Sequence, residues 1–454
     1  MNLSLQRIIK SVSGLIATSV VALLAAANAH ADNPAETLRN GMRLIINERH
    51  RFPMVTIDLW VRAGSADEGP GQDGCAHFLE HTLFKGTTLH GPGYSDFTIE
   101  SAGGSLDAET GADFAHYYTE IPSDKLNTGL KEISDIIRHA VFPDTEVERE
   151  RAVILDELAR HDERPAARIQ DRLYNLAFGN QPYAKSPGGE PTAIKFRARD
   201  SLVAFYSRNY VPQRCALILA GDVDSAAATR AVDRYFGDWT SPEDQTPQPI
   251  PAPAQTVSRA RMSARRGERP VIGIAYAAPS AVSRSDSAVA EVVAEILSSQ
   301  FGRGTTSIAA WSGTAVTVNY AARHGTSLLS VIATLQGPPI SRPFEQSLSP
   351  AISDIPMLEA ALRKAIDSLA TQPPSASTVS AAVRTLQGQI AYDIETNTGL
   401  AREMGLAATI GGSDPAELSP LLSQIKPEHV QNFAMRWLTG KQSYTVILDA
   451  EQAE

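Results

Sequence analysis

The stretch HFLEHTLFKG, residues 77–86, holds two histidines and a glutamate in a spacing that suits metal binding. His77, Glu80 and His81 occupy positions i, i+3 and i+4, so a helix would place all three side chains on one face. The chain has only 10 histidines, which makes this His-x-x-Glu-His pattern an uncommon coincidence. The alternative is a solvated helix face with incidental histidines, and a third ligand would favour the metal site.

A candidate third ligand lies in EVERERAVILDELARHDE, residues 146–163. Glu150 and Glu157 are seven residues apart, so in a helix they would share a face after two turns. Glutamates on a helix usually face solvent, which is the alternative for this pair. Apolar residues are interspersed with them, however, which predicts that part of this face lies near the core. Two imidazoles and one carboxylate would leave a zinc ion an open fourth position, as catalytic sites require.

The first 31 residues have the features of a secretory signal peptide. Arg7 and Lys10 precede an apolar run, and Ala29-His30-Ala31 has the small-x-small form of a cleavage site. A membrane anchor is the alternative, but the run is short for a span and is diluted by serine and threonine. We expect an exported, periplasmic protein with no membrane contact beyond the signal peptide.

Composition narrows the class of partner. The formal net charge is −10, and removal of Arg7 and Lys10 with the signal peptide lowers it to −12. This balance argues against a nucleic-acid or anionic-lipid surface, so the expected partners are peptides or proteins. A chain of 454 residues with 43% hydrophobic residues exceeds one ordinary core and predicts two or more domains.

Cys75 and Cys215 are the only cysteines, and a CxxC metal motif is absent. An export compartment permits a disulfide, but two cysteines far apart in sequence do not establish one. Both lie beside apolar residues, so we expect buried free thiols.

The proline-rich stretch SPEDQTPQPIPAPAQTV, residues 241–257, predicts an exposed linker between two domains, residues 32–240 and 258–454. Both halves follow one plan. A strand precedes a helix near the start of each half, as MVTIDLWVRAGS and CAHFLEHTLF in the first and RPVIGIAYAAPS and SAVAEVVAEILSSQF in the second. Each half ends with a Phe-x-x-Arg helix and an apolar strand, which predicts a duplication.

The second copy has Ala294, Glu295 and Ile296 where the histidine-bearing turn should be, so its helix lacks metal ligands. Two further segments of the first half, SDKLNTGLKEISDIIRHAVF and DTEVERERAVILDELARHDE, have the pattern of amphipathic helices. Asp144 or Thr145 is the expected N-cap of the latter. Each half is therefore predicted as α+β, a largely antiparallel sheet with helices packed on one side.

The motif HFLEH, followed 76 residues after His81 by Glu157 in ERAVILDE, resembles the inverted zinc motif of the pitrilysin or M16 metallopeptidases. The similarity is greatest to two-domain members akin to mitochondrial processing peptidase β subunits and bacterial processing peptidases. It extends over roughly residues 36–240, where LRNGMRLIINERHRFPMVTIDLWVRAGSADE, GGSLDAETGADFAHYYTEIP and FYSRNYVPQRCALILAGDVD all match segments of the family. The second half matches mainly in plan. The implied fold is the LuxS/M16 metallopeptidase-like fold.

The resemblance implies a zinc endopeptidase that acts on peptides or unfolded segments. His77, His81 and Glu157 would bind one zinc ion per chain. Glu80 would act as general base toward the attacking water and then pass the proton to the departing amine. Glu150 corresponds to an acid that orients the site without binding metal.

The resemblance also implies a substrate-binding strand, beside which a peptide adds as a further strand. In this chain that segment is Gly103, Gly104, Ser105, Leu106, Asp107 and Ala108. The two glycines would allow close approach of the substrate, although a simple turn before a strand explains them equally well. The chain departs from the family at Asp107, where asparagine is usual. An ionised Asp accepts hydrogen bonds but donates none, so side-chain contacts to the substrate would change.

Family members complete the active site with an Arg and, seven residues later, a Tyr from a second-half domain. Here Gly313 precedes Tyr320 by seven residues, so the pair is missing. The resemblance thus predicts a ligand-free M16 homologue as the partner chain. Two alternatives are that Arg303 or Arg323 substitutes, or that this divergent segment aligns differently.

Two hypotheses of function follow. One is the zinc endopeptidase, as the catalytic chain of a two-chain assembly. The other is a non-catalytic subunit or scaffold of the same fold in an exported complex. The presence of His77, Glu80, His81 and Glu157 together favours the first.

Overall fold

The computed structural model describes residues 35–241, 252–253, 258–302, 314–335, 354–438 and 442–450. The predicted signal peptide, nearly all of the predicted linker, and Arg303 and Gly313 lie outside these ranges. Across the described ranges, none of the helices combines the length and apolar character needed to span a bilayer.

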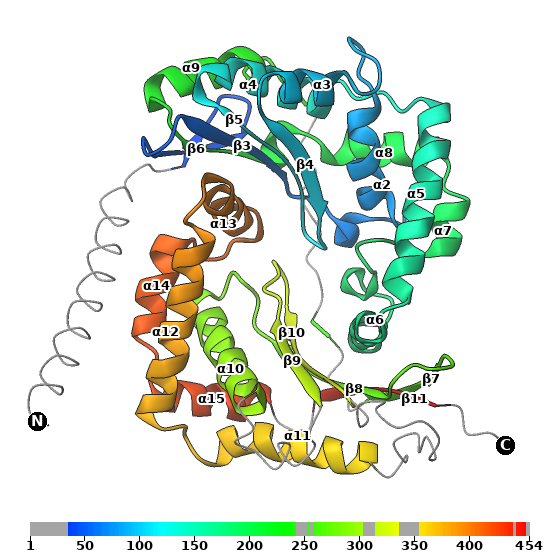
Figure 1. Ribbon diagram of the computed structural model, residues 1–454, viewed down its shortest axis with the longest axis vertical. Helices are drawn as coiled ribbons and strands as arrows, with labels where there is room; N and C mark the ends of the chain where they lie inside the picture. The colour runs from blue at the N-terminus through cyan, green and yellow to red at the C-terminus, as the bar shows by residue number, and fades with distance from the viewer. Residues whose placement is uncertain are drawn as a thin grey trace, which may run out of the picture.

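The first half forms a six-stranded sheet in the order β1-β2-β6-β3-β5-β4 (Figure 1). Its strands are β1 (Glu36–Thr37), β2 (Arg43–Glu48), β3 (Met54–Val61), β4 (Ser105–Thr110), β5 (Ala115–Pro122) and β6 (Cys215–Gly221). Neighbouring strands are antiparallel except β2 and β6, which are parallel. β4 pairs only with β5 and forms an edge of the sheet.

The second half repeats this sheet with the same order and directions. Its strands are β7 (Ser258–Ala264), β8 (Val271–Ala278), β9 (Ala315–Tyr320), β10 (Ser327–Thr334) and β11 (Ser443–Ala450), in the order β7-β11-β8-β10-β9. β7 and β11 are parallel, as β2 and β6 are, and β9 occupies the edge position of β4. Apart from β1, the two sheets correspond strand for strand, which agrees with the predicted duplication.

Helices pack against one face of each sheet from within the same half. The first half contains α2 (Cys75–Thr82), α3 (Tyr94–Ser101), α4 (Leu126–Arg138), α5 (Asp144–Asp162), α6 (Pro165–Phe178), α7 (Pro191–Lys195), α8 (Arg199–Asn209) and α9 (Ser225–Phe236). The second contains α10 (Arg284–Gly302), α11 (Asp354–Thr371), α12 (Ala376–Asp393), α13 (Asn397–Ile410), α14 (Pro415–Ser423) and α15 (Pro427–Trp437). The predicted α+β class is confirmed.

The structure tests the predicted amphipathic helices and the predicted state of the two cysteines. The predicted amphipathic helices correspond to α4 and α5, but the expected N-cap of α5 is wrong. The helix begins at Asp144, and the residue before it, Pro143, has no side-chain acceptor for the first N–H groups. Cys75 and Cys215 are buried and unbonded, as expected, and burial raises the pKa of the Cys75 thiol to about 12.

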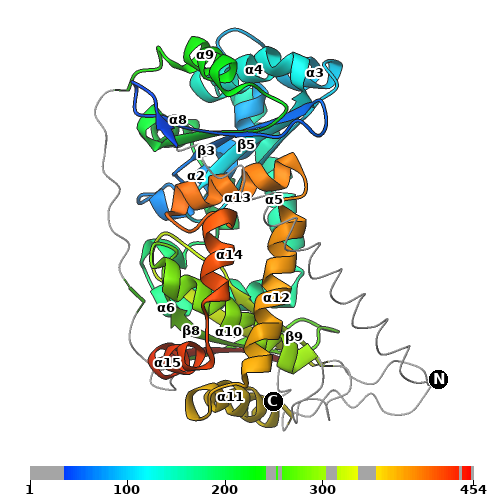
Figure 2. The ribbon, with the colours of Figure 1, turned by 90° about the vertical axis from the view of Figure 1, so that its left-hand side faces the viewer.

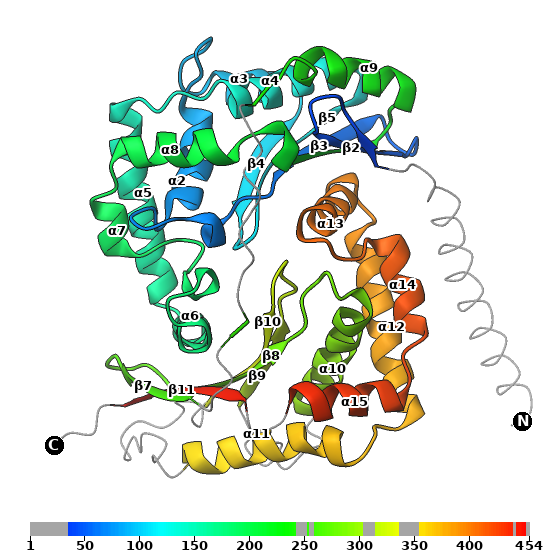
Figure 3. The same cartoon turned by 180° about the vertical axis from the view of Figure 1, so that it is seen from behind.

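The remaining face of each sheet is covered by a helix from the opposite half. α13 packs on β3 and β6 of the first sheet, and Figure 2 shows it lying directly beneath that sheet. α6 packs on β8 and β11 of the second sheet and lies over them in Figure 3. The two halves therefore exchange helices and share two buried interfaces.

This exchange explains why β3 is buried on both faces although its sequence alternates. Val55, Ile57 and Leu59 face the helices of the first half. The intervening residues face α13, where the Thr56 hydroxyl is 3.1 Å from that of Thr398. An alternating strand usually has one solvated face, but here the polar positions meet partners from elsewhere in the chain.

The contact between α13 and β3 is close enough to require a glycine. A Cβ atom at Gly405 would lie 2.0 Å from Nε1 of the buried Trp60. The two elements can pack at this distance only because Gly405 has no side chain.

We predict that Gly405→Ala destabilises the protein by about 1–3 kcal/mol or more, because the added methyl group overpacks the interface. Urea unfolding measures the change. Gly388→Ala on α12 is the matched control, because a Cβ there meets no atom within 4 Å. The control should leave stability unchanged or raise it by roughly 0.5–1 kcal/mol. Equal effects of the two substitutions would contradict the packing argument.

Candidate metal centre

Two histidines of α2 and one glutamate of α5 converge at the boundary of these helices. His77 and His81 lie one turn apart on α2, and their rings meet edge to face, with centroids 4.9 Å apart and ring planes at 89°. Oε2 of Glu157 lies 3.6 Å from Nε2 of His77 and 3.4 Å from Nε2 of His81. The three ligand atoms lie within 4.8 Å of one another.

This arrangement fits a zinc ion. Ligand bonds of about 2.0–2.1 Å in a tetrahedron place neighbouring donor atoms roughly 3.3 Å apart, close to the distances found here. The donor set of two imidazoles and one carboxylate is typical of catalytic zinc and leaves a fourth position free. Burial lowers the pKa of His77, so its imidazole is neutral and able to donate a lone pair.

Glu150 and Glu157 occupy different positions around the site although they share one face of α5. The Glu150 side chain is 12% exposed, and its Oε2 lies 3.1 Å from Nδ1 of His81. Its Oε1 lies 3.1 Å from Nζ of Lys85. The Glu157 side chain is 49% exposed and faces both histidines. Glu150 is thus placed to fix the orientation of His81, with Nε2 left toward Glu157.

Glu80 lines a cleft of about 190 Å³ between α2 and the edge strand β4. The other lining residues are His81, Phe84, Lys85, Asp107, Ala108 and Glu150. The Glu80 carboxylate makes no hydrogen bond or ion pair with any residue that the structure describes. The Glu80 carboxylate therefore lies beside His81 and faces the cleft without a hydrogen-bond partner among the described residues.

The structure brings two of the six predicted substrate-binding residues to this cleft. Asp107 and Ala108 line it, whereas Gly103, Gly104, Ser105 and Leu106 do not. Asp107 Oδ2 accepts a hydrogen bond of 3.1 Å from the Tyr118 hydroxyl, and Oδ1 accepts one of 2.8 Å from the Ala108 N–H, so both carboxylate oxygens already have a donor within the chain.

The two glycines before β4 are required by the local backbone, one for its conformation and the other for close packing. Gly103 has φ +84° and forms the turn after α3. A Cβ at Gly104 would lie 2.7 Å from the carbonyl oxygen of Glu120 on the neighbouring strand. The turn before the strand thus accounts for both, and their contact with substrate stays a prediction.

The second half offers no comparable centre among its described residues, where His, Cys, Asp and Glu form no group of three with converging donor atoms. Arg323, one of the two suggested substitutes for the missing arginine, stacks on Tyr174 and Tyr183 at 4.0 and 4.7 Å. Its guanidinium is therefore engaged at the contact between the halves.

Comparisons with known proteins identify the family and agree with the fold. The family model described as Insulinase (Peptidase family M16) matches residues 43–189, and the model described as Peptidase M16 inactive domain matches residues 198–386. The chain belongs to peptidase family M16. The first M16 model spans α2 and α5 and so includes the histidines and both glutamates.

Curated M16 relatives include an uncharacterized zinc protease of Rickettsia bellii, 32% identical over 206 residues, or 45% of this chain and 50% of that protein. The mitochondrial-processing peptidase subunit beta of Lentinula edodes is 29% identical over 230 residues, or 51% of this chain and 47% of that protein. The chain thus matches about half the length of these relatives. The first of these relatives is named a zinc protease and the second a processing peptidase.

The crystal structure of a protease from Helicobacter pylori has the same fold, with a TM-score of 0.80. It covers 91% of this chain and 98% of its own, at 18% identity. At this identity the likeness concerns the fold alone, and it extends through both M16 halves.

Glu68, a residue outside the predicted site, holds the start of α2. Glu68 is buried, and its two carboxylate oxygens each accept a 2.9 Å hydrogen bond, from the backbone N–H groups of Gly74 and Ala76. These groups begin the helix, and His77 follows directly. Glu68 lies seven residues before Cys75, the first residue of the helix, so the usual capping pattern does not predict it.

Burial raises the pKa of Glu68 from 4.5 to about 8. The folded protein therefore holds this proton more tightly than the unfolded chain does. The stability contributed by protonated Glu68 is complete below about pH 4.5 and is lost as the pH rises through 8.

We predict that the unfolding free energy of the wild type, relative to Glu68→Gln, falls by a few kcal/mol between pH 4.5 and 8, since one pKa unit corresponds to about 1.4 kcal/mol. Denaturant titrations with a metal chelator present measure it without interference from metal binding. Glu163→Gln, at an exposed carboxyl on the surface, is the control. Parallel pH profiles of wild type and Glu68→Gln would contradict the prediction.

Proposed function

We propose that this chain is a zinc-dependent endopeptidase in which His77, His81 and Glu157 bind one zinc ion and Glu80 is the general base. The observation that carries the proposal is the convergence of these three donors beside an uncommitted carboxylate in a cleft. Membership of family M16 and the zinc-protease names of its relatives support the same chemistry.

Each residue has a distinct part in the proposed reaction. Zinc, when bound, supplies a Lewis acid that polarises the peptide carbonyl and activates water. Glu80 lies one residue before His81, so its carboxylate is held close to the ligands. It accepts a proton from the attacking water and transfers it to the amine that departs. Glu150 hydrogen-bonds Nδ1 of His81 and keeps Nε2 available.

The substrate is proposed to be a peptide or an unfolded protein segment that pairs with the free edge of β4. Among the residues that the structure describes, β4 pairs with β5 alone, which leaves backbone groups on its other edge. That strand contributes Asp107 and Ala108 to the cleft that contains Glu80. A peptide added there as a strand would bring its backbone carbonyls toward the proposed zinc ligands.

The second candidate function is a non-catalytic M16 subunit or scaffold. Its support is the match of residues 198–386 to the inactive domain of the family. That match begins after both α2 and α5 and includes no residue of either helix. The first half keeps both histidines, Glu157 and Glu80 in one site, so we favour the enzyme.

We predict that Glu80→Gln retains zinc but loses about a hundredfold to ten-thousandfold of peptidase activity, because the amide cannot accept the proton. Glu157→Gln should lose zinc as well as activity, because a catalytic site needs three protein ligands. Metal analysis and cleavage of an unstructured fluorogenic peptide measure both effects. Wild-type turnover by Glu80→Gln would refute the base assignment, and full zinc occupancy in Glu157→Gln would remove Glu157 from the ligand set.

We further propose that the active enzyme pairs this chain with a ligand-free M16 homologue in the periplasm. The arginine seven residues before Tyr320 is missing from the sequence, where Gly313 stands. The Arg323 guanidinium lies over the rings of Tyr174 and Tyr183. The Tyr320 hydroxyl donates a hydrogen bond of 2.9 Å to the Pro279 carbonyl oxygen. Both side chains are therefore engaged within this chain. Export follows from the proposed signal peptide, residues 1–31, and the domains are proposed as residues 32–240 and 258–454 joined by 241–257.

The partner proposal predicts low peptidase activity for the zinc-loaded chain purified alone. Loss of oxyanion stabilisation costs about 3–4 kcal/mol, so a partner that supplies it should raise kcat by roughly a hundredfold or more. Peptide hydrolysis by the chain alone and by the chain co-expressed with a ligand-free homologue from its source measures the difference. Equal activity of the two preparations would rule the partner requirement out.

A further inference from the structure

A short backbone bridge joins the segment that leaves α2 to the segment that enters α5. The Val141 N–H donates to the Gly86 carbonyl oxygen at 3.0 Å, and the Thr88 N–H donates to the His139 carbonyl oxygen at 2.9 Å. Thr87 and Ala140 pair between them as an isolated antiparallel bridge. Gly86 lies five residues after His81, and Val141 lies nine residues before Glu150.

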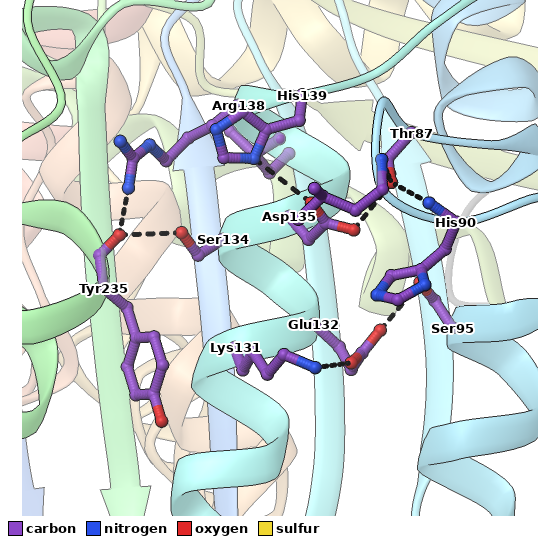
Figure 4. Close-up of polar contacts among 12 residues, drawn as sticks. Thr87, His90, Ser95, Lys131, Glu132, Ser134, Asp135, Arg138, His139 and Tyr235 are labelled. Atoms are coloured by element: carbon purple, nitrogen blue, oxygen red, sulfur yellow. Dashed lines mark hydrogen bonds and ion pairs between the residues drawn. The ribbon is translucent and has the colours of Figure 1, made fainter.

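The Thr87 hydroxyl is the centre of the polar network around this bridge (Figure 4). It donates to Oδ2 of Asp135 at 2.7 Å and accepts from the N–H groups of Leu89 and His90 at 3.2 and 3.0 Å. Oδ1 of Asp135 lies 3.1 Å from Nδ1 of His139. Thr87 and Asp135 are both buried, so each hydroxyl and carboxylate interaction is shielded from water.

α2 needs such external support. It has eight residues, and its flanking residues Gly74 and Leu83 supply no side-chain cap, so its start depends on the distant Glu68 carboxylate. A helix of this length is unstable alone, and its orientation depends on the segments that hold it. Catalytic geometry tolerates only about 0.5 Å of displacement.

We propose that Thr87 and Asp135 are positioning residues of the metal centre. Their hydrogen bond fixes the exit of α2 against the C-terminal turn of α4, from which the chain enters α5. It thereby sets the placement of His81 relative to Glu150 and Glu157. This inference rests on the proposed zinc site.

A second buried hydroxyl–carboxylate pair, with its carboxylate on α4, provides a matched control. The Ser95 hydroxyl donates to Oε2 of Glu132 at 2.9 Å, and both residues are buried (Figure 4). This bond also reaches α4, but it starts from α3 and lies off the backbone bridge between the ligand helices. Loss of either bond removes a buried interaction of the same kind, and only the Thr87 bond lies at the bridge between the segment after α2 and the segment before α5.

The test compares Thr87→Val, Thr87→Ser, Asp135→Asn and Ser95→Ala in the full chain. The Zn2+ dissociation constant is measured by competition with a chelator, coordination geometry by the visible spectrum of the Co2+-loaded protein, and stability by Tm. Thr87→Val should weaken Zn2+ binding roughly tenfold or more, as loss of a supporting residue typically does, and should change the Co2+ spectrum. Thr87→Ser keeps the hydroxyl and should restore wild-type values.

Ser95→Ala should lower Tm without changing Zn2+ affinity or the Co2+ spectrum. Asp135→Asn weakens the acceptor without removing it and should shift Zn2+ affinity in the same direction as Thr87→Val, by less. It serves as the test if Thr87→Val does not fold. Wild-type affinity and spectrum in Thr87→Val, or in Asp135→Asn, would overturn the positioning role, as would equal losses in Ser95→Ala. If the wild type itself binds no Zn2+, the proposed function fails first.

Discussion

The exchange of helices between the two halves is the constraint on which the rest of the structure depends. Each sheet has apolar residues on the face that its own helices leave open, including Trp60 in the first half and Tyr444 in the second. α13 and α6 remove these faces from water, which provides a hydrophobic driving force for keeping the halves together. α6 follows α5 after two residues, so the helix that carries Glu150 and Glu157 is anchored on the sheet of the opposite half.

The candidate metal centre lies between this anchored helix and α2, which has little stability of its own. α5 is long and continues into the α6 interface, where Arg168 pairs with Glu268 of the second half at 2.7 Å. α2 is short and is held from outside, by the Glu68 carboxylate at its start and by the Thr87 bridge after its end. The geometry of the site therefore depends on buried polar contacts more than on helix propensity.

The two sheets share one strand order, but only the first half carries the candidate metal ligands. The edge strands β4 and β9 are equivalent, and each lies beside a helix, α2 or α10. α2 carries the histidines, whereas the corresponding turn of α10 is Ala294, Glu295 and Ile296. Within the described residues, the second half contributes α13, which covers β3 and β6, and Arg323, which lies over Tyr174 and Tyr183. Its contacts therefore stabilise the first half.

Sequence alone determined what depends on spacing along the chain. It predicted that His77, Glu80 and His81 share a helix face, that Glu150 and Glu157 share another, and that the halves repeat one α+β plan. These features follow from the periods of helices and strands, which sequence records directly.

Tertiary structure decided which surfaces meet. Thr56 and Asp58 have the pattern of a solvated strand face, yet both are buried, because Thr398 and His116 supply their polar partners. The alternation is the same whether the polar face meets water or distant side chains, so the pattern cannot distinguish the two. Likewise, two glutamates on one helix face became a candidate ligand and its support only where α5 packed against α2. Contacts between residues far apart in the chain leave no period in the sequence, and only the folded packing selects them.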